Sequence, residues 1–156
     1  GSTFGLRVRY IQQEAPLGLA HAVKIAQPYL QDSPFVMYLG DNLVRDGIGD
    51  FVREFAEHEC DAQILLARVG NPSSFGVAEL DGKGRVVRLE EKPAQPRSDL
   101  ALVGVYMLNR TVFEAVHALR PSARGAIEIS FERGDEGTGG GCIRPRSAGG
   151  RHRPAA

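Results

Sequence analysis

The chain has 156 residues, of which 42% are hydrophobic and 24% charged, and its formal net charge is zero. This length fits one domain with a buried core. The zero charge gives no electrostatic reason to expect binding to nucleic acid or to an acidic membrane surface, and no apolar run approaches the roughly 20 residues that span a bilayer. Its two cysteines, Cys60 and Cys142, form no C-x-x-C pair, so neither a disulfide framework nor a zinc site is indicated. We therefore expect a cytoplasmic protein, for which a small anionic ligand remains open.

Strand and helix patterns alternate through the first half of the chain. Residues 7–12 alternate polar and apolar side chains, as a half-buried strand would. Apolar residues recur at spacings of three and four over residues 17–30, which predicts a helix. Residues 35–39 form a continuous apolar run that is typical of a strand covered on both faces. A second amphipathic helix is expected after Asp46, its predicted N-cap, and a further apolar strand over residues 62–69.

The second half adds a hairpin, a strand and a helix. Residues 75–80 and 85–90 flank a glycine-containing turn, which predicts a hairpin. Residues 100–108 are typical of a buried strand, and a third helix over residues 111–119 should end before Pro121. These patterns predict an α/β fold with a Rossmann-like, mostly parallel mixed sheet flanked by helices, in which ligands bind at the carboxyl ends of strands.

Beyond Arg133 the pattern is lost. Residues 134–156 contain seven glycines, four arginines and one large aliphatic residue, Ile143. Such a segment cannot bury enough apolar surface to offset the entropy of ordering. We expect residues 134–156 to form a Gly/Arg-rich disordered tail.

Four segments in a fixed order carry a resemblance to a known family. They are Tyr10-Ile11-Gln12-Gln13-Glu14-Ala15-Pro16-Leu17-Gly18-Leu19-Ala20, Gly40-Asp41-Asn42, Phe75-Gly76-Val77-Ala78-Glu79-Leu80 and Glu90-Glu91-Lys92-Pro93, followed by Leu102-Val103-Gly104-Val105-Tyr106. Together they resemble the nucleotidyltransferase domain of sugar-1-phosphate nucleotidylyltransferases of the glucose-1-phosphate thymidylyltransferase kind, over residues 3–129. The resemblance implies a fold of the nucleotide-diphospho-sugar transferase type.

The chain departs from the family pattern in two places. The glycine-rich phosphate loop that opens the family's domain is absent, and residues 125–130 resemble a family motif but lack its following aspartate. We therefore expect an N-terminally truncated, incomplete nucleotidyltransferase domain over residues 1–133 with an aberrant C-terminus. The second metal-binding carboxylate of the family would then be missing.

Asp41 is the candidate catalytic metal ligand. It follows a predicted buried strand, and Mg²⁺ prefers carboxylate oxygen together with phosphate oxygens and water. By resemblance, Asp41 holds Mg²⁺ during nucleotidyl transfer. The structural alternative is that Asp41 only caps a turn, since Gly-Asp-Asn is a common turn composition.

The loop before the first helix is the candidate nucleotide site. A stiff turn, a glycine and the free N–H groups of a helix start suit an anionic ligand. By resemblance, Gln13 hydrogen-bonds the pyrimidine edge, while Pro16, Gly18 and Leu19 pack against the base and ribose. The alternative is an ordinary strand-to-helix loop.

Glu91 and Lys92 are the candidate ligands of the sugar phosphate. A carboxylate can accept hydrogen bonds from sugar hydroxyls, and an ammonium offsets phosphate charge. By resemblance, Glu91 binds the sugar, Lys92 binds its phosphate and acts in catalysis, and the backbone around Gly76, Val103 and Gly104 completes the pocket. The alternative is a surface salt bridge near a strand end.

The resemblance implies transfer of a nucleotidyl group from dTTP to glucose 1-phosphate with Mg²⁺, giving dTDP-glucose and pyrophosphate, with activity impaired in this fragment. Gln13, Asp41, Glu91 and Lys92 should then converge on one crevice. The alternatives are a non-catalytic sugar-nucleotide-binding or regulatory remnant, a related enzyme with another nucleoside triphosphate or sugar phosphate, and an unrelated doubly wound domain. No nucleic-acid or membrane partner is expected, and a homo-oligomer remains open.

Overall fold

The computed structural model describes residues 2–58, 60–118 and 143–147. These residues fall into two units. One unit holds residues 2–31 and 113–118, and the other holds residues 32–112 and 143–147.

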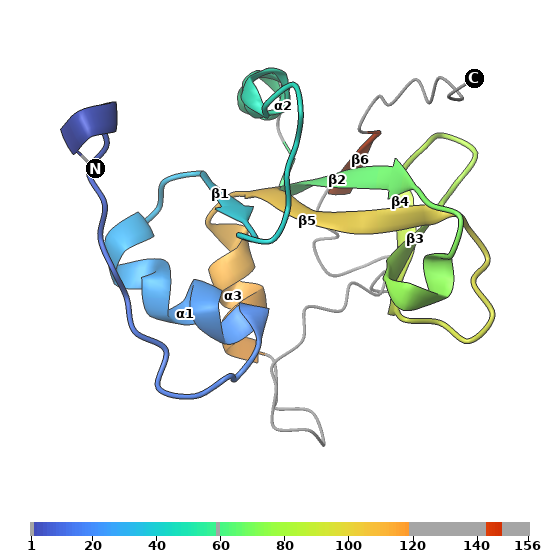
Figure 1. Cartoon of the computed structure of the whole chain (residues 1–156), viewed down its shortest axis with the longest axis horizontal. Coiled ribbons are helices and arrows are strands. Elements are labelled where there is room, and N and C mark those ends of the chain that lie inside the picture. Colours follow the sequence, from blue (N-terminus) through green and yellow to red (C-terminus); the bar gives the residue numbers. More distant parts are fainter. Residues whose placement is uncertain (1, 59, 119–142, 148–156) are drawn as a thin grey trace. The chain divides into compact units, whose positions relative to one another are not determined.

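The second unit is built on one sheet (Figure 1). Its strands are β1 (Phe35–Tyr38), β2 (Ala62–Arg68), β3 (Gly76–Leu80), β4 (Val86–Glu91), β5 (Leu100–Leu108) and β6 (Ile143–Ser147). They run in the order β4-β3-β5-β2-β6, and β1 pairs with β5 as well. The continuous apolar runs expected to form strands therefore do so, within a residue or two of the predicted ends.

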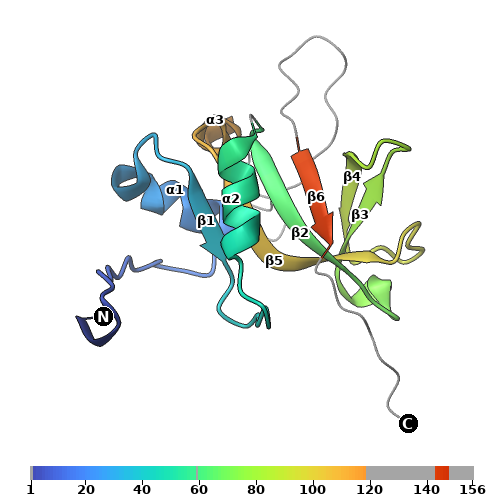
Figure 2. The same ribbon diagram turned by 90° about the horizontal axis from the view of Figure 1, so that it is seen from above.

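The α/β fold class is confirmed, but the expected mostly parallel pairing is wrong. Within the described residues, β2 and β6 pair in parallel, whereas the β1–β5, β2–β5, β3–β4 and β3–β5 pairs are antiparallel. The reason is the position of β5, which runs antiparallel between β1 and β2 (Figure 2). Leu108 of β5 pairs with Phe35 on one side and with Ala62 on the other. A late strand thus separates two strands that are consecutive in the chain.

The predicted hairpin is confirmed as β3 and β4, joined by residues 81–85. The Asp81 N–H donates to the Arg85 carbonyl at 2.8 Å, and the Asp81 carboxylate accepts from the N–H groups of Lys83 and Arg85, each at 2.9 Å. Gly84 has φ +75°, in the left-handed region that glycine adopts without strain. This local network fixes the register in which Gly76 lies opposite Glu91.

Side chains alternate between the two faces of the sheet. Leu65, Val105 and Met107 pack on one face with Phe55 of α2 (Gly49–Glu57), which lies over that face in Figure 1. The other face carries a second cluster that includes Ile64, Leu66, Leu102 and Tyr106. The period of two in β2 and β5 therefore separates an α2 side from an opposite side.

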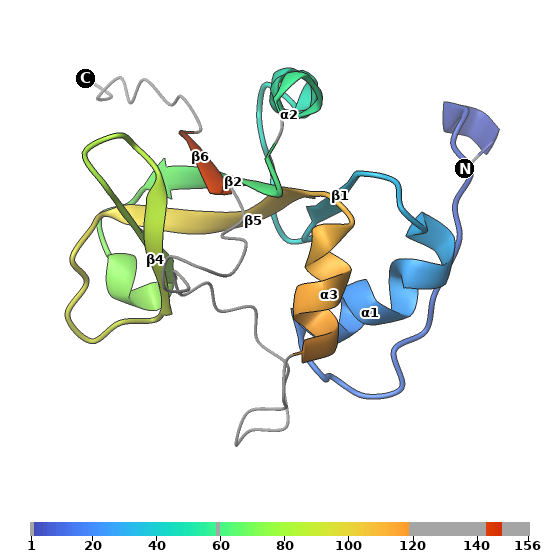
Figure 3. The same ribbon diagram turned by 180° about the vertical axis from the view of Figure 1, so that it is seen from behind.

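Two further α-helices, α1 (Leu19–Leu30) and α3 (Thr111–Ala118), confirm the predicted helices, and residue 119 lies outside the described residues. They lie side by side in Figures 1 and 3, and His117 of α3 hydrogen-bonds Gln27 of α1 at 2.7 Å. Short 3₁₀ helices cover Ser2–Phe4 and Pro72–Ser74. None of the helices in the described ranges has both the length and the apolar stretch needed to span a bilayer.

Asp46 is not the N-cap of α2, contrary to expectation. The helix begins at Gly49 with Ile48 as N-cap. A turn closed by the Gly47 N–H on the Val44 carbonyl at 3.1 Å, with φ +72° at Gly47, separates Asp46 from the helix start.

Two other expectations are wrong. Residues 7–12 form no strand, and Val8 and Tyr10 are 57% and 92% exposed, because no strand in the described part of the chain pairs with them. In the expected disordered tail, residues 143–147 form β6 and pair with β2. Backbone hydrogen bonds to an open strand edge do not need an apolar side-chain pattern, and proline such as Pro145 is tolerated in an edge strand. The rest of residues 134–156 lies outside the described residues.

Candidate functional site

The four predicted nucleotide residues lie in one loop and helix start of the first unit. Gly18, with φ +90°, precedes the first residue of α1, and its carbonyl oxygen accepts from Gln13 Nε2 at 3.2 Å. Gln13 Nε2 also lies 3.0 Å from His21 Nδ1. Pro16 and Leu19 are exposed. The Gln13 side chain is therefore anchored, while the neighbouring apolar side chains are accessible.

In the second unit, the loop after β1 carries Asp41 on an anchored backbone. The Leu39 N–H donates to the Gly104 carbonyl at 2.9 Å, and the Asn42 N–H donates to the Leu39 carbonyl at 3.1 Å. The Tyr38 hydroxyl accepts from the Val44 N–H at 3.2 Å and donates to the Asn42 carbonyl at 3.4 Å. These contacts hold the loop at both ends.

The Asp41 carboxylate is exposed, and its Oδ1 accepts from Asn42 Nδ2 at 2.9 Å. The alternative role for Asp41 was to cap or turn the chain after the strand, and Asp41 does lie in the turn that the Asn42 N–H closes on the Leu39 carbonyl. Among the hydrogen bonds of the described residues, the donor to its carboxylate is the neighbouring Asn42 side chain. Asp41 thus presents carboxylate oxygen to solvent at the carboxyl end of β1.

Gly104 fits closely under the Asp41 loop. Its φ is +69°, and a Cβ placed there would lie 2.5 Å from Asn42 Nδ2 and 2.9 Å from Leu39 Cδ1. The left-handed backbone favours glycine at this position, and the side chains of Asn42 and Leu39 occupy the space that a Cβ would need. The predicted role of the Gly104 backbone in completing the sugar pocket stays a prediction.

Gly76, Glu91 and Lys92 meet where β3 begins and β4 ends. Gly76 pairs with Glu91, and a Cβ on Gly76 would lie 3.0 Å from Glu91 Oε2 and 3.6 Å from Leu102 Cδ1. Lys92 follows with φ +45°, and its N–H donates to the Phe75 carbonyl at 3.0 Å. Both side chains are exposed.

The alternative for Glu91 and Lys92 was a surface salt bridge, and the ion pairs of the described residues do not include one at either side chain. On β4 the ion pair joins Arg88 to Glu90 at 3.0 Å. Among the ion pairs of the described ranges, none includes Glu91 or Lys92. Their charges are available to a ligand.

Tyr106 was not singled out by the sequence patterns. Burial raises the pKa of its phenol, and the negative charge of Glu91 raises it further, which places the two side chains within electrostatic reach. The signal that could have found it is its spacing from Gly104: residues two apart on a strand point to the same face. Tyr106 thus lies near Glu91, the predicted ligand of the sugar.

Two of the predicted groups of the second unit lie beside β5: Leu39, before Asp41, bonds to Gly104, and Gly76 begins the strand that pairs with β5 through Val77. Leu102 and Tyr106 lie on the face of the sheet opposite α2, and Glu91 lies near both. The Asn42 amide lies against Gly104, which is between Leu102 and Tyr106 in sequence. Val103 packs with the α2 side, so only its backbone can serve the site. Convergence of Gln13 with these residues in one crevice stays a prediction.

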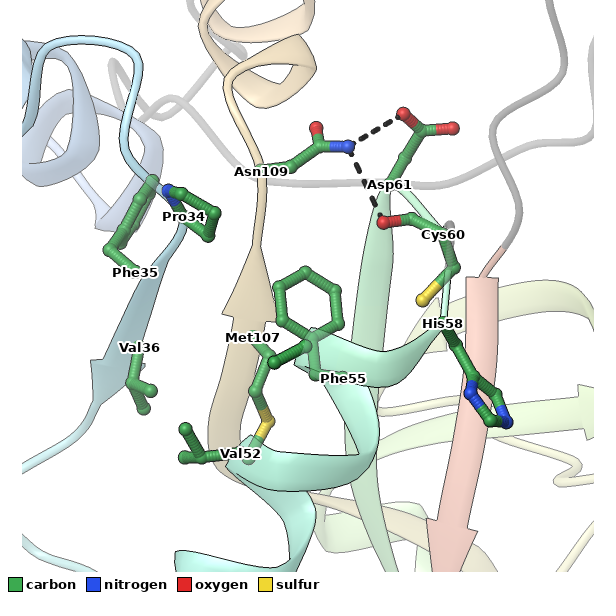
Figure 4. A pocket seen from close by; sticks show the side chains of 11 residues that line it. Pro34, Phe35, Val36, Val52, Phe55, His58, Cys60, Asp61, Met107 and Asn109 are labelled. Carbon is green, nitrogen blue, oxygen red and sulfur yellow. Dashed lines mark hydrogen bonds between the residues drawn. The ribbon is translucent and has the colours of Figure 1, made fainter.

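A hollow of about 550 Å³ lies elsewhere in the second unit (Figure 4). Its lining includes Phe35, Val52, Phe55, His58, Cys60 and Met107. Asn109 bounds it by donating to Asp61 Oδ1 at 3.1 Å and to the Cys60 carbonyl at 3.3 Å. The hollow opens on the α2 side, at the start of β1, and its lining is largely apolar and includes none of the predicted site residues. The hollow therefore does not coincide with the predicted phosphate site.

Comparison with known proteins settles the family. The sequence profile of the family described as Nucleotidyl transferase matches residues 1–132. The chain belongs to the nucleotidyl transferase family. The resemblance drawn from the four motifs is thereby confirmed at the level of the family.

Relatives within this family carry the name expected from the motifs. A glucose-1-phosphate thymidylyltransferase of Streptomyces antibioticus is 59% identical over 131 residues, and one of Streptomyces griseus is 55% identical over 130 residues; each alignment covers 83% of this chain. The chain spans 37% of the length of each of these two curated relatives.

A solved structure agrees with the nucleotidyl transferase fold. The crystal structure of a Bacillus anthracis protein assigned as a glucose-1-phosphate thymidylyltransferase, in complex with sucrose, matches with a TM-score of 0.80 at 31% identity. The match covers 94% of this chain and 58% of that chain. The α/β sheet described above is thus the fold of this family.

The carboxylate of Asp41 is a suitable ligand for a magnesium ion that also binds substrate phosphates. Mg²⁺ is usually held by one or two carboxylates together with substrate phosphates and water, rather than by a cage of protein ligands. Within residues 2–58, 60–118 and 143–147, no three His, Cys, Asp or Glu side chains gather as a metal-binding group. A single exposed carboxylate on an anchored loop suits a metal that substrate phosphates help to bind.

Proposed function

We propose that this chain contributes to a glucose-1-phosphate thymidylyltransferase, which transfers a thymidylyl group from dTTP to glucose 1-phosphate in the cytoplasm and releases pyrophosphate. The observation that carries the proposal is that the Asp41 loop and the Gly76–Glu91 pair both lie beside β5, the loop through Leu39 and Gly104 and the pair through Val77 and Ala101. The names of the relatives at 59% and 55% identity support the choice of substrates.

In this reaction a phosphate oxygen of the sugar phosphate attacks the α-phosphorus of dTTP, and the bond to the leaving pyrophosphate breaks. The protein has little covalent work to do, so its role is to align the substrates and stabilise charge. Lys92 offsets the charge of the sugar phosphate. Glu91 accepts hydrogen bonds from sugar hydroxyls. Its Oε2 lies 3.0 Å from the position that a Cβ on Gly76 would occupy, so this glycine leaves space beside the carboxylate.

Asp41 would hold Mg²⁺ through its exposed carboxylate. A bound Mg²⁺ neutralises charge on the phosphate oxygens. The protein's own contribution is to fix the direction of the carboxylate, which Asn42 does by its hydrogen bond to Oδ1. In the nucleotide loop, Gln13 binds the pyrimidine edge, and Pro16, Gly18 and Leu19 contact the base and ribose.

The proposal is tested by substrate binding and by pyrophosphate release. The affinity of the 156-residue chain for glucose 1-phosphate is measured by calorimetry in the presence of Mg²⁺. Lys92→Met should weaken binding by roughly tenfold or more, because a charge-assisted hydrogen bond contributes about 1.5–3 kcal/mol. Lys83→Met, at an exposed lysine in the β3–β4 turn, is the matched control and should leave the affinity unchanged.

The outcomes separate the candidate functions. Pyrophosphate release that Asp41→Asn abolishes supports the proposed reaction, whereas release that persists in this variant removes Asp41 from the mechanism. Substrate binding without pyrophosphate release supports the alternative, a non-catalytic sugar-nucleotide-binding module. Absence of saturable binding of both dTTP and glucose 1-phosphate overturns the proposal for this chain.

A further inference from the structure

The Gln13 side-chain amide makes two contacts through the same atom. Its Nε2 lies 3.2 Å from the Gly18 carbonyl oxygen and 3.0 Å from His21 Nδ1. The three residues belong to one unit of the structure, and Gln13 and His21 are both half-buried. His21 lies in the first turn of α1, eight residues after Gln13.

The chemistry of these partners fixes which way the amide faces. A backbone carbonyl oxygen can only accept a hydrogen bond, so the group next to Gly18 must be the NH₂ of Gln13. The second N–H of that NH₂ then points at His21 Nδ1, which must accept it. This requires the His21 tautomer that carries its proton on Nε2. The carbonyl oxygen of Gln13, Oε1, is engaged by neither partner.

We propose that His21 is a positioning residue that holds the Gln13 amide with Oε1 presented to the nucleotide base. This inference rests on the proposed function, in which Gln13 binds the pyrimidine edge. Gly18 alone provides one of the two contacts, and rotation about the last side-chain bond could still exchange Oε1 and Nε2. His21 opposes that exchange, because a flipped amide would set Oε1 against the acceptor Nδ1, and only a move of the ring proton from Nε2 to Nδ1 would relieve this contact.

The fixed orientation selects bases by their hydrogen-bonding pattern. Thymine and uracil carry a hydrogen on N3, which donates to an acceptor such as Oε1. Cytosine has a lone pair on N3, which opposes Oε1. An unpaired polar contact of this kind is a stronger source of discrimination than a missing methyl group. The Gln13–His21 pair therefore favours a nucleoside triphosphate whose base is a donor at N3.

The test compares affinities for dTTP and dCTP, measured by calorimetry on the 156-residue chain and its variants. His21→Leu replaces the imidazole with an apolar side chain of similar size and so removes the acceptor. The ratio of dTTP to dCTP affinity should fall about fivefold, the effect of one hydrogen bond between uncharged groups. His21→Gln restores an acceptor oxygen within reach and should recover most of the ratio.

Lys24→Ala is the matched control, since Lys24 is an exposed residue one turn further along α1. The ratio should be unchanged in this variant. An unchanged ratio in folded His21→Leu overturns the role of His21. A wild-type chain that does not distinguish dTTP from dCTP, with no effect of Gln13→Ala, overturns the assignment of Gln13 in the proposed function, and the inference falls with it.

A second measurement needs no nucleotide. Long-range ¹H–¹⁵N spectra of the imidazole report which ring nitrogen of His21 carries the proton. The expected result is a proton on Nε2 with Nδ1 as acceptor, and a shift of the Gln13 side-chain NH₂ signals in His21→Leu. A proton on Nδ1 would contradict the proposed orientation whether or not the chain binds dTTP.

Discussion

Replacing Gly104 with alanine should destabilise the sheet unit and displace the Asp41 loop. The new methyl group would lie 2.5 Å from Asn42 Nδ2, 2.9 Å from Leu39 Cδ1 and 3.1 Å from Leu39 Cβ. The Asn42 amide can rotate away, but Leu39 Cβ is attached to backbone that hydrogen-bonds Gly104 itself. The loop must therefore move to admit the methyl group.

Two separate costs add up. An alanine at φ +69° lowers the free energy of unfolding by about 1–2 kcal/mol, because left-handed backbone is unfavourable for a residue with a Cβ. The overpacked contact with Leu39 and Asn42 adds about 1–3 kcal/mol. The expected loss in the free energy of unfolding is therefore about 2–5 kcal/mol.

Gly84→Ala separates the two costs, because Gly84 has φ +75° and no atom within 4 Å of the added Cβ. It should lose only the backbone part, about 1–2 kcal/mol. Urea unfolding followed by circular dichroism gives both values in the same unit of the chain. If Gly104→Ala is no more destabilising than Gly84→Ala, the close approach of the Asp41 loop to Gly104 is refuted.

Three further predictions follow from the same unit. The Arg85 backbone N–H and then its guanidinium lower the pKa of Asp81 from 3.8 to about 2, so the stabilising effect of the ionised carboxylate is present above about pH 4 and is lost as pH falls toward 2; the difference in urea midpoint between wild type and Asp81→Asn should narrow over that range, and a constant difference would contradict it. Burial and the charge of Glu91 raise the pKa of Tyr106 above 10, so the neutral phenol stabilises the fold below that pH and the effect is lost at higher pH; Glu91→Gln should lower this pKa in an absorbance titration, with Tyr106→Phe identifying the signal. Leu65→Ala, at a side chain 1% exposed, should cost about 2–5 kcal/mol in unfolding free energy, whereas Leu43→Ala, at a side chain 94% exposed, should change it by less than about 0.5 kcal/mol.

Local patterns were sufficient to place most helices and strands. The run over residues 100–108 became β5 with the predicted ends, and the turn residues 81–84 join β3 to β4 as expected. Such features depend on side chains close together in sequence. The insertion of β5 between β1 and β2 depends on pairing across more than thirty residues, about which hydrophobic periodicity carries no information.

The predictions were wrong in two kinds of place: where a strand-like sequence had no neighbouring strand to pair with, and where a strand formed without an apolar pattern. Residues 7–12 alternate as a strand does, but a strand needs a neighbour to satisfy its backbone. The reverse holds for β6, a segment without an apolar pattern that nevertheless pairs with β2. The assumption that an apolar pattern is required for order failed there.

Part of the candidate site could be predicted from motifs and part could not. The sequence motifs name Asp41, Glu91 and Lys92, and the roles of these residues stay predictions. The contact of His21 with Gln13 could not be read, because a glutamine and a histidine eight positions apart meet only through the turn that Gly18 makes. Tyr106 was missed because a tyrosine in a buried strand is ordinarily a core residue.

The backbone of Lys92 has a consequence for the stability of the fold. Lysine is a poor choice for left-handed backbone, which suits glycine best and asparagine next, and the residue has φ +45°. The exposed ammonium makes no ion pair among the described residues that would compensate the fold for this choice. Lysine at position 92 therefore makes the fold less stable than glycine there would, by about 1–2 kcal/mol for the left-handed backbone.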